Sequence, residues 1–161
     1  MALTDETKNN IQTPEDDVID INLEGIKRSR FRINGRVGAI IELNLSDLSI
    51  VDRLEKGMQK LSVEMSKISN IPEDEENYSE IMHQADQNMR EYVDYIFDYP
   101  VSAVCAPQGS TMFDPTDGMF RYEHIIDGLT KLYADNINAE YKKINARLKK
   151  HTEKYVSKKR K

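Results

Sequence analysis

Apolar and polar residues alternate in two short segments near the start of the chain, residues 18–23 and 30–33. A period of two is typical of a half-buried β-strand. Asn34-Gly35 follows the second segment and is the strongest short signal for a β-hairpin, because both central positions of a type I′ turn need a positive φ. The apolar run over residues 37–43 supplies the partner strand. We therefore expect a small antiparallel sheet of two or three strands, which needs a helix to cover its apolar face.

A helical pattern begins directly after the expected sheet. Asn44 or Ser46 can cap this first helix, because a short polar side chain accepts hydrogen bonds from free N–H groups of the first turn. Gly57 lowers the stability of the helix without ending it, and the pattern stops by Asn70, before Pro72. The apolar residues recur in steps of three and four, as in an amphipathic helix, at Val51, Leu54, Met58, Leu61, Met65 and Ile68.

Two more helices are predicted further along the chain. After an acidic linker, one spans roughly residues 77–98, and Pro100 prevents its continuation. The stretch that follows, up to Gly118, is rich in proline and glycine and predicts a loop. The last helix begins near Asp117 and runs to about residue 150 or beyond.

These elements predict an α+β fold that is mostly α, with a small N-terminal antiparallel sheet followed by a bundle of about three helices. Residues 1–17 are expected to form a disordered acidic arm, because their hydrophobicity is low and their charge is of one sign. A length of 161 residues suits one domain. That domain spans residues 18–150, with the sheet over 18–43 and the helices over 44–150. Residues 151–161 form a basic tail.

The charge is strongly polarised along the chain, although the net charge is only −5. Residues 1–24 hold one lysine and seven acids (−6), and residues 142–161 hold ten basic residues and one acid (+9), which leaves −8 between them. The basic segment predicts contact with nucleic acid or with an acidic protein surface. An acidic surface is at least as good a candidate as DNA, since the rest of the chain carries −14 and aromatic residues are few. The other interpretation is a solvated helix end, where cations suit the negative end of the helix dipole.

Several classes of protein and site are disfavoured by the sequence. No run of about 18 apolar residues predicts a membrane-spanning helix, and the polar, acidic N-terminus is no secretory signal. The single cysteine, Cys105, indicates a reducing compartment and has no catalytic signature beside it. His83, His124 and His151 lack a second ligand at metal-binding spacing, and residues 114–118 favour a turn with a helix cap over a calcium loop. We expect no catalytic residue, cofactor or metal, and therefore not an enzyme.

The order of elements resembles a known family. The hairpin Arg30-Phe-Arg-Ile-Asn-Gly-Arg-Val-Gly-Ala-Ile-Ile-Glu-Leu43 leads directly into Asn44-Leu-Ser-Asp-Leu-Ser-Ile-Val-Asp-Arg-Leu54 and a long amphipathic helix. Tyr92-Val-Asp-Tyr-Ile-Phe97, a loop that contains glycine, and Tyr122-Glu-His-Ile-Ile-Asp-Gly-Leu129 fit the same layout. In element order, residues 19–161 resemble the small tail assembly chaperones of long-tailed bacteriophages, particularly those of phages that infect Gram-positive hosts.

The resemblance implies a non-enzymatic role in the host cytoplasm. Such chaperones are thought to bind the tape measure protein, a very long helical chain, and to keep it soluble until tail tube subunits assemble around it. The tape measure protein and the tail tube protein are therefore the implied partners, and self-association stays open. The alternatives are a structural protein of the phage tail or connector, which would be found in purified particles, and an accessory protein that binds nucleic acid through its basic C-terminus.

Candidate partner-binding residues come from two patterns. Methionine side chains are flexible and suit adaptable binding surfaces, although packing in the core remains the ordinary role of such a stripe. Lysine and arginine suit an acidic partner. The candidates are one face of the first helix, Leu54, Met58, Leu61 and Met65, and the basic residues Lys149, Lys150, Lys158, Lys159, Arg160 and Lys161.

Overall fold

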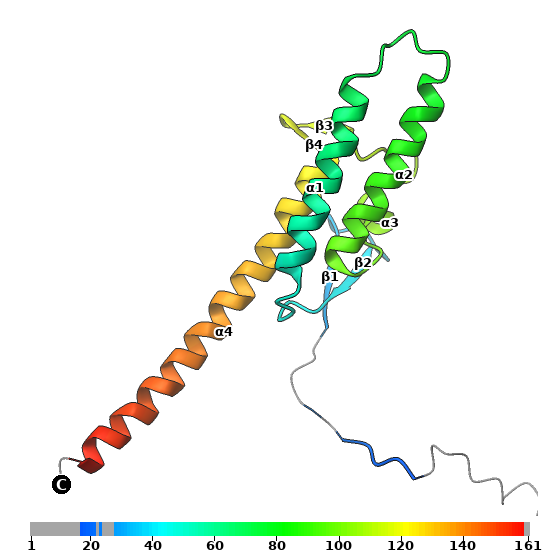
Figure 1. The fold of residues 1–161 in the computed structure, drawn as a ribbon. Helices are drawn as coiled ribbons and strands as arrows, with labels where there is room; N and C mark the ends of the chain where they lie inside the picture. Colours follow the sequence, from blue (N-terminus) through cyan, green and yellow to red (C-terminus); the bar gives the residue numbers. More distant parts are fainter. Residues whose placement is uncertain (1–16, 22, 24–27, 160–161) are drawn as a thin grey trace, which may run out of the picture.

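The computed structural model describes residues 17–21, 23 and 28–159 of the chain. Within these residues it contains four helices and two small antiparallel sheets, and the order is β1, β2, α1, α2, α3, β3, β4, α4 (Figure 1). The predicted fold class is confirmed: the protein is α+β and mostly helical, with a small antiparallel sheet near the N-terminus and the helices after it. The predicted arm, residues 1–17, lies outside the described residues except for Asp17.

The N-terminal sheet is a hairpin of two short strands. Strand β1 (Ser29–Arg32) pairs antiparallel with β2 (Ile40–Leu43). The alternation expected from the sequence is present, since Phe31 is half-buried while Ile41 and Leu43 are fully buried in the core. The sheet thus contributes one apolar face to the interior, as a half-buried sheet must.

The turn of this hairpin is longer than its sequence signal suggests. Asn34 and Gly35 have φ angles of 52° and 68°, and the N–H of Arg36 donates to the carbonyl of Ile33 at 3.0 Å, as in the predicted type I′ turn. A second turn at Gly38, with φ 81°, then adds residues to the loop. Because of this second turn, β2 begins at residue 40 and not at 37 as predicted.

The strand predicted over residues 18–23 is absent from the described part of that segment. Residues 18–21 and 23 lie in no strand, and their apolar side chains are exposed, Ile19 by 84% and Leu23 by 80%. Residue 22 lies outside the described residues. Alternation alone cannot form a strand, because the backbone N–H and C=O groups also need a neighbouring strand to pair with.

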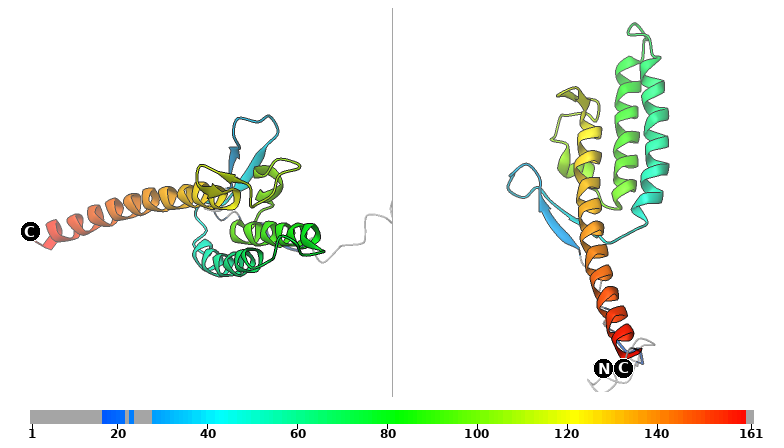
Figure 2. Two further views of the ribbon diagram at one scale, coloured as in Figure 1. Left: turned by 90° about the horizontal axis from the view of Figure 1, so that it is seen from above. Right: turned by 90° about the vertical axis from the view of Figure 1, so that its left-hand side faces the viewer.

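Helices α1 (Ile50–Ser69) and α2 (Tyr78–Phe97) form an antiparallel pair joined by the acidic linker (Figures 1 and 2). The end of α1 and both ends of α2 agree with the sequence prediction. The start of α1 does not. Asn44 and Asp47 each accept a hydrogen bond from a backbone N–H two residues ahead, at 3.2 and 2.9 Å. These local hydrogen bonds stabilise turns in place of a first helical turn, so α1 begins at Ile50.

The buried face of α1 is rotated relative to the predicted apolar stripe. Gly57 is buried against α2, and a Cβ atom added there would lie 2.3 Å from Cγ1 of Ile96. This glycine therefore permits a close approach of the two helices, and the predicted stripe residues Val51 and Met58 remain exposed. Glycine at this position has a packing function that its helix propensity alone does not indicate.

The predicted loop before the last helix contains regular structure. The short helix α3 (Val101–Cys105) is held at its start by Asp94, whose carboxylate accepts hydrogen bonds from the backbone N–H and the hydroxyl of Ser102 at 2.8 and 2.9 Å. Strands β3 (Pro115–Thr116) and β4 (Met119–Phe120) form a small hairpin. Its turn is Asp117-Gly118, with φ angles of 54° and 76°, so α4 (Arg121–Lys159) begins four residues later than predicted.

The core lies where β2, α1, α2, α3 and the first half of α4 meet. Phe97 and Tyr133 pack with ring centroids 6.2 Å apart and join α2 to α4. The largest fully buried side chains are Ile41, Leu43, Leu61, Met89, Ile96, Met112, Val93 and Val101. This core supports the base of α4, and the rest of that helix extends away from it (Figures 1 and 2).

Candidate partner-binding surface

Helix α4 has two parts with different surroundings. In its first part Ile126, Leu129 and Tyr133 are buried against the core. Beyond it, every side chain from Asn138 to Lys154 is exposed. The helix leaves the body near Asn136, whose side-chain amide donates to the hydroxyl of Ser46 at 3.3 Å. We refer to residues 138–159 as the projecting segment.

An apolar stripe continues from the body onto this segment. Ile137, Tyr141, Ile144 and Leu148 recur in steps of four, three and four, which places them on one face of the helix. Tyr141 and Leu148 are 50% and 51% exposed, and Ile144 is 39% exposed. No element in the described part of the chain covers these three side chains. We refer to these four residues as the α4 stripe.

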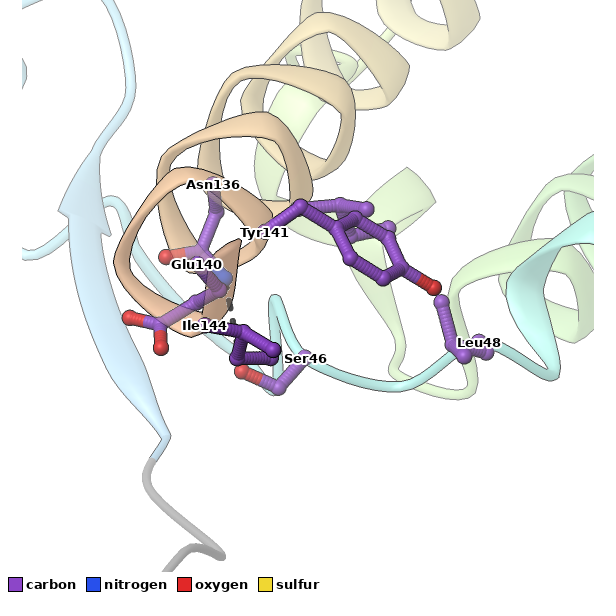
Figure 3. A pocket seen from close by; sticks show the side chains of 7 residues that line it. Ser46, Leu48, Asn136, Glu140, Tyr141 and Ile144 are labelled. Carbon is purple, nitrogen blue, oxygen red and sulfur yellow. Dashed lines mark hydrogen bonds between the residues drawn. The ribbon is translucent and has the colours of Figure 1, made fainter. Parts of the chain in front are cut away.

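The base of the α4 stripe borders two grooves. One, of about 260 Å³, lies between α4 and the turn that precedes α1, and there Tyr141 extends toward Leu48 (Figure 3). The other, of about 490 Å³, lies between α4 and the first turns of α1 and is lined by Val51 and Leu54 among others. Ile137 lines both, so the grooves and the stripe form one continuous apolar surface.

Basic side chains are numerous on the projecting segment, and most of them lie on the faces of α4 away from the stripe. The predicted candidates Lys149 and Lys150 are exposed on the projecting segment. Lys158 and Lys159 lie in the last turn of α4, although the structure does not describe their side chains, and the candidates Arg160 and Lys161 lie outside the described residues. Lys143 pairs with Glu140 at 3.4 Å. The cations also suit the negative end of the α4 dipole.

The other predicted candidates do not form one exposed face. Leu61 is buried in the core at 1% exposure, whereas Leu54 and Met65 are half-buried and Met58 is exposed. Of these four, Leu54 reaches the surface described above, because it lines the groove between α1 and α4. The signal for the α4 stripe was present in the sequence, since apolar residues at helical spacing occur there among lysines. It could be assigned to the core equally well until the position of the helix was known.

The titratable groups that could perform chemistry lie elsewhere. Burial raises the pKa of the Cys105 thiol to about 11, so this thiol is protonated near neutral pH and is a poor nucleophile. His83, His124 and His151 are exposed, and a ring nitrogen of His124 lies 2.6 Å from the carbonyl oxygen of Thr116. In residues 17–21, 23 and 28–159 no group of three or more His, Cys, Asp or Glu side chains is placed to hold a metal ion.

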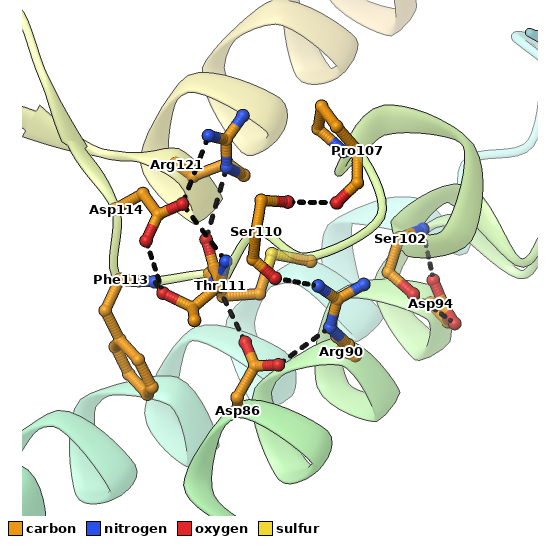
Figure 4. A network of polar contacts seen from close by, with 11 residues as sticks. Asp86, Arg90, Asp94, Ser102, Pro107, Ser110, Thr111, Phe113, Asp114 and Arg121 are labelled. Atoms are coloured by element: carbon orange, nitrogen blue, oxygen red, sulfur yellow. Dashed lines mark hydrogen bonds and ion pairs between the residues drawn. The ribbon is translucent and has the colours of Figure 1, made fainter. Parts of the chain in front are cut away.

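A polar network fixes the loop between α3 and α4 (Figure 4). The buried carboxylate of Asp86 accepts hydrogen bonds from the backbone N–H of Met112 at 2.7 Å and from Nε of Arg90 at 2.9 Å. Arg90 also donates to the carbonyl of Ser110 at 2.7 Å. These bonds join α2 to the loop that leads into α4 and hold that loop beside the first turn of α4, where the N–H of Tyr122 donates to the carbonyl of Met112 at 3.1 Å.

No helix among the described residues is both long and apolar enough to cross a membrane. No protein-family model, curated protein or solved structure matches the chain.

Proposed function

We propose that this protein is a non-enzymatic tail assembly chaperone of a long-tailed bacteriophage, which binds and solubilises the tape measure protein in the host cytoplasm. The tail tube protein is the second proposed partner. The single observation that supports the proposal best is the projecting segment of α4, on which an apolar stripe is exposed along one face while the other faces are rich in basic side chains.

The physical basis is the pairing of amphipathic helices. Apolar residues repeating every three and four positions along one helix pack against a second helix with the same period. A tape measure protein, as a very long helical chain, exposes apolar stripes that would aggregate if nothing covered them. A helix that extends away from a folded body can pair with such a chain along several turns, and its lysines keep the free chaperone soluble.

Co-expression tests this function. We expect the tape measure protein of the phage that encodes this chain to move from the insoluble to the soluble fraction when the full-length chain is co-expressed, and to co-purify with it. The double variant Ile144→Ser/Leu148→Ser should lose the effect. The matched control is Val156→Ser, which changes an exposed aliphatic side chain of the same helix away from the stripe. The proposal is wrong if the unmodified chain gives neither solubility nor co-purification.

Two other functions predict different results. A nucleic-acid-binding accessory protein, suggested by the exposed lysines of α4, would bind oligonucleotides with an affinity that falls steeply with salt and is lost when residues 142–161 are removed. A structural tail or connector protein would be present in purified phage particles, from which a chaperone should be absent.

A further inference from the structure

We infer that the partner segment that binds the α4 stripe is an acidic amphipathic helix. The end of this helix nearest the body of the protein lies against the two grooves at the base of the stripe. This inference rests on the proposed function and specifies the chemistry of the partner. It is drawn from the geometry of the stripe, from the charges beside it and from the alternatives that those charges disfavour.

The surface has the dimensions of a helix-binding site. From Ile137 to Leu148 the stripe rises about 16 Å at 1.5 Å per residue, or three helical turns. At its base, the side chains of Leu48 and Val51 are exposed by 56% and 65% and border the grooves beside Ile137 and Tyr141. A helix laid along the stripe would therefore contact α4 along its length and the turn before α1 at its inner end.

The charges around the stripe select an acidic partner. The exposed residues 138–154 include six basic residues, Lys142, Lys143, Arg147, Lys149, Lys150 and Lys154, and two acids, Glu140 and Glu153, which gives a net +4. At about 100° per residue, Glu140, Arg147 and Lys154 lie along one side of the stripe. The other side is neutral, with Asn138 and Asn145, and Lys149 lies farther round the helix. Acidic side chains flanking the apolar face of a partner helix would meet these cations.

The same charges disfavour pairing between two copies of this segment. Two α4 helices joined through the stripe would bring together two segments of net charge +4, and this like net charge opposes their association. The stripe is also narrow, because Asn138 and Asn145 lie beside it, whereas a helix that lies on a lipid surface presents a broad apolar face. Nucleic acid would engage the lysines and leave the stripe uncovered. An acidic helix satisfies both features of the surface.

A pair of designed peptides tests the inference with the full-length chain. Each is a three-heptad helix with leucine at positions a and d, and positions e and g carry glutamate in the acidic peptide and lysine in the basic one. Like charges at e and g keep each peptide from pairing with itself. Fluorescence anisotropy should show binding of the labelled acidic peptide with a Kd at least about tenfold lower than that of the basic peptide.

Variants locate the site on the chain. We expect Ile144→Ser/Leu148→Ser to raise the Kd for the acidic peptide at least about tenfold, because two apolar contacts are removed. Val156→Ser, about 90° away from the stripe, should leave the Kd within about twofold. All three side chains are exposed, so the variants should keep the circular dichroism of the unmodified chain.

Several results would overturn the inference. The first group is found with the peptides: no binding of the acidic peptide, equal affinity for the two peptides, or an equal loss of affinity in the stripe variant and in the Val156→Ser control. The second group concerns other occupants of the stripe: a dimer in sedimentation that the stripe variant no longer forms, or binding to phosphatidylglycerol vesicles that requires the stripe. Failure of the proposed function is separately visible. If the unmodified chain binds the acidic peptide through the stripe but does not bind the tape measure protein, the inferred site stands and the proposed function is wrong. If a stripe variant still solubilises the tape measure protein, the proposed function stands and the inferred site is wrong.

Discussion

The two parts of α4 share one apolar period and have opposite surroundings. In residues 121–137 most of the apolar side chains are buried in the core, as Ile126, Leu129 and Tyr133 are, and two basic and three acidic residues give a net −1. In residues 138–159 the period continues, the stripe is exposed, and eight basic and two acidic residues give a net +6. Periodicity therefore specifies a helix and its apolar face, but it does not specify whether that face is covered by the same chain. The net charge changes sign near the position where the body of the protein stops covering the apolar face of α4.

The largest expected difference between the two parts is in the cost of removing a tyrosine from each. Tyr133 is buried at 3% exposure and packs against Phe97, so Tyr133→Ala should lower the free energy of unfolding by about 3–5 kcal/mol. Tyr141 is half-exposed, and Tyr141→Ala should change the same quantity by less than about 0.5 kcal/mol. Urea denaturation of the two variants measures both values. Equal losses would mean that the projecting segment is covered in the free protein.

A smaller but related effect is expected from the network that positions the buried part of α4. Asp86→Ala leaves the Arg90 guanidinium and the Met112 N–H without their shared acceptor, so the free energy of unfolding should fall by about 3 kcal/mol. Asp135, an exposed carboxylate on α4 itself, is the matched control, and Asp135→Ala should have an effect within about 0.5 kcal/mol. Urea denaturation again gives the values, and a loss in Asp86→Ala no larger than in the control would show that the network adds nothing to stability.

The sequence predicted those features of the fold that depend on nearby residues. The bounds of α2, the end of α1 and the positive φ angles at Asn34 and Gly35 all follow from short-range patterns, and the structure has them. Helix α3 could not be predicted in the same way. Its first turn depends on Asp94, a residue of the preceding helix that comes close only when the chain has turned back on itself.

The errors of prediction have the same origin. Residues 18–23 carry the pattern of a strand, but no strand in the described structure pairs with them. Met58 belongs to the apolar stripe of α1, but the packing of Ile96 over Gly57 turns another face of α1 inward. The predicted binding face on α1 is therefore partly core, whereas the exposed stripe on α4 was not among the predicted candidates. In each case a partner distant in sequence decides burial, and periodicity contains no information about that partner.

The smallest expected effects come from two carboxylates, Asp94 on α2 and Asp114 in the loop before α4. Hydrogen bonds from the side chain and backbone of Thr111, together with Arg121 at the first position of α4, lower the pKa of Asp114 below its usual 3.8. Burial raises the pKa of Asp94 above the same value. Carbon-detected NMR titration should therefore show Asp94 taking up its proton at a higher pH than Asp114.

The two groups have opposite effects on stability as the pH falls. A lowered pKa means that the contribution of Asp114 to stability is present above pH 3.8 and is lost as the pH falls through the pKa of the folded protein. A raised pKa means that the folded protein binds a proton at Asp94 more tightly than the unfolded chain does, so acidification through this range favours folding at that site.

Asp114→Asn removes the contribution of the Asp114 carboxylate and should weaken the link between Thr111 and Arg121 that fixes the start of α4. The projecting segment should not respond, so its amide chemical shifts should follow the same pH dependence in the variant and in the unmodified chain. A changed pH dependence confined to the segment's amides would mean that the two parts of α4 are coupled in a way that their different surroundings do not suggest.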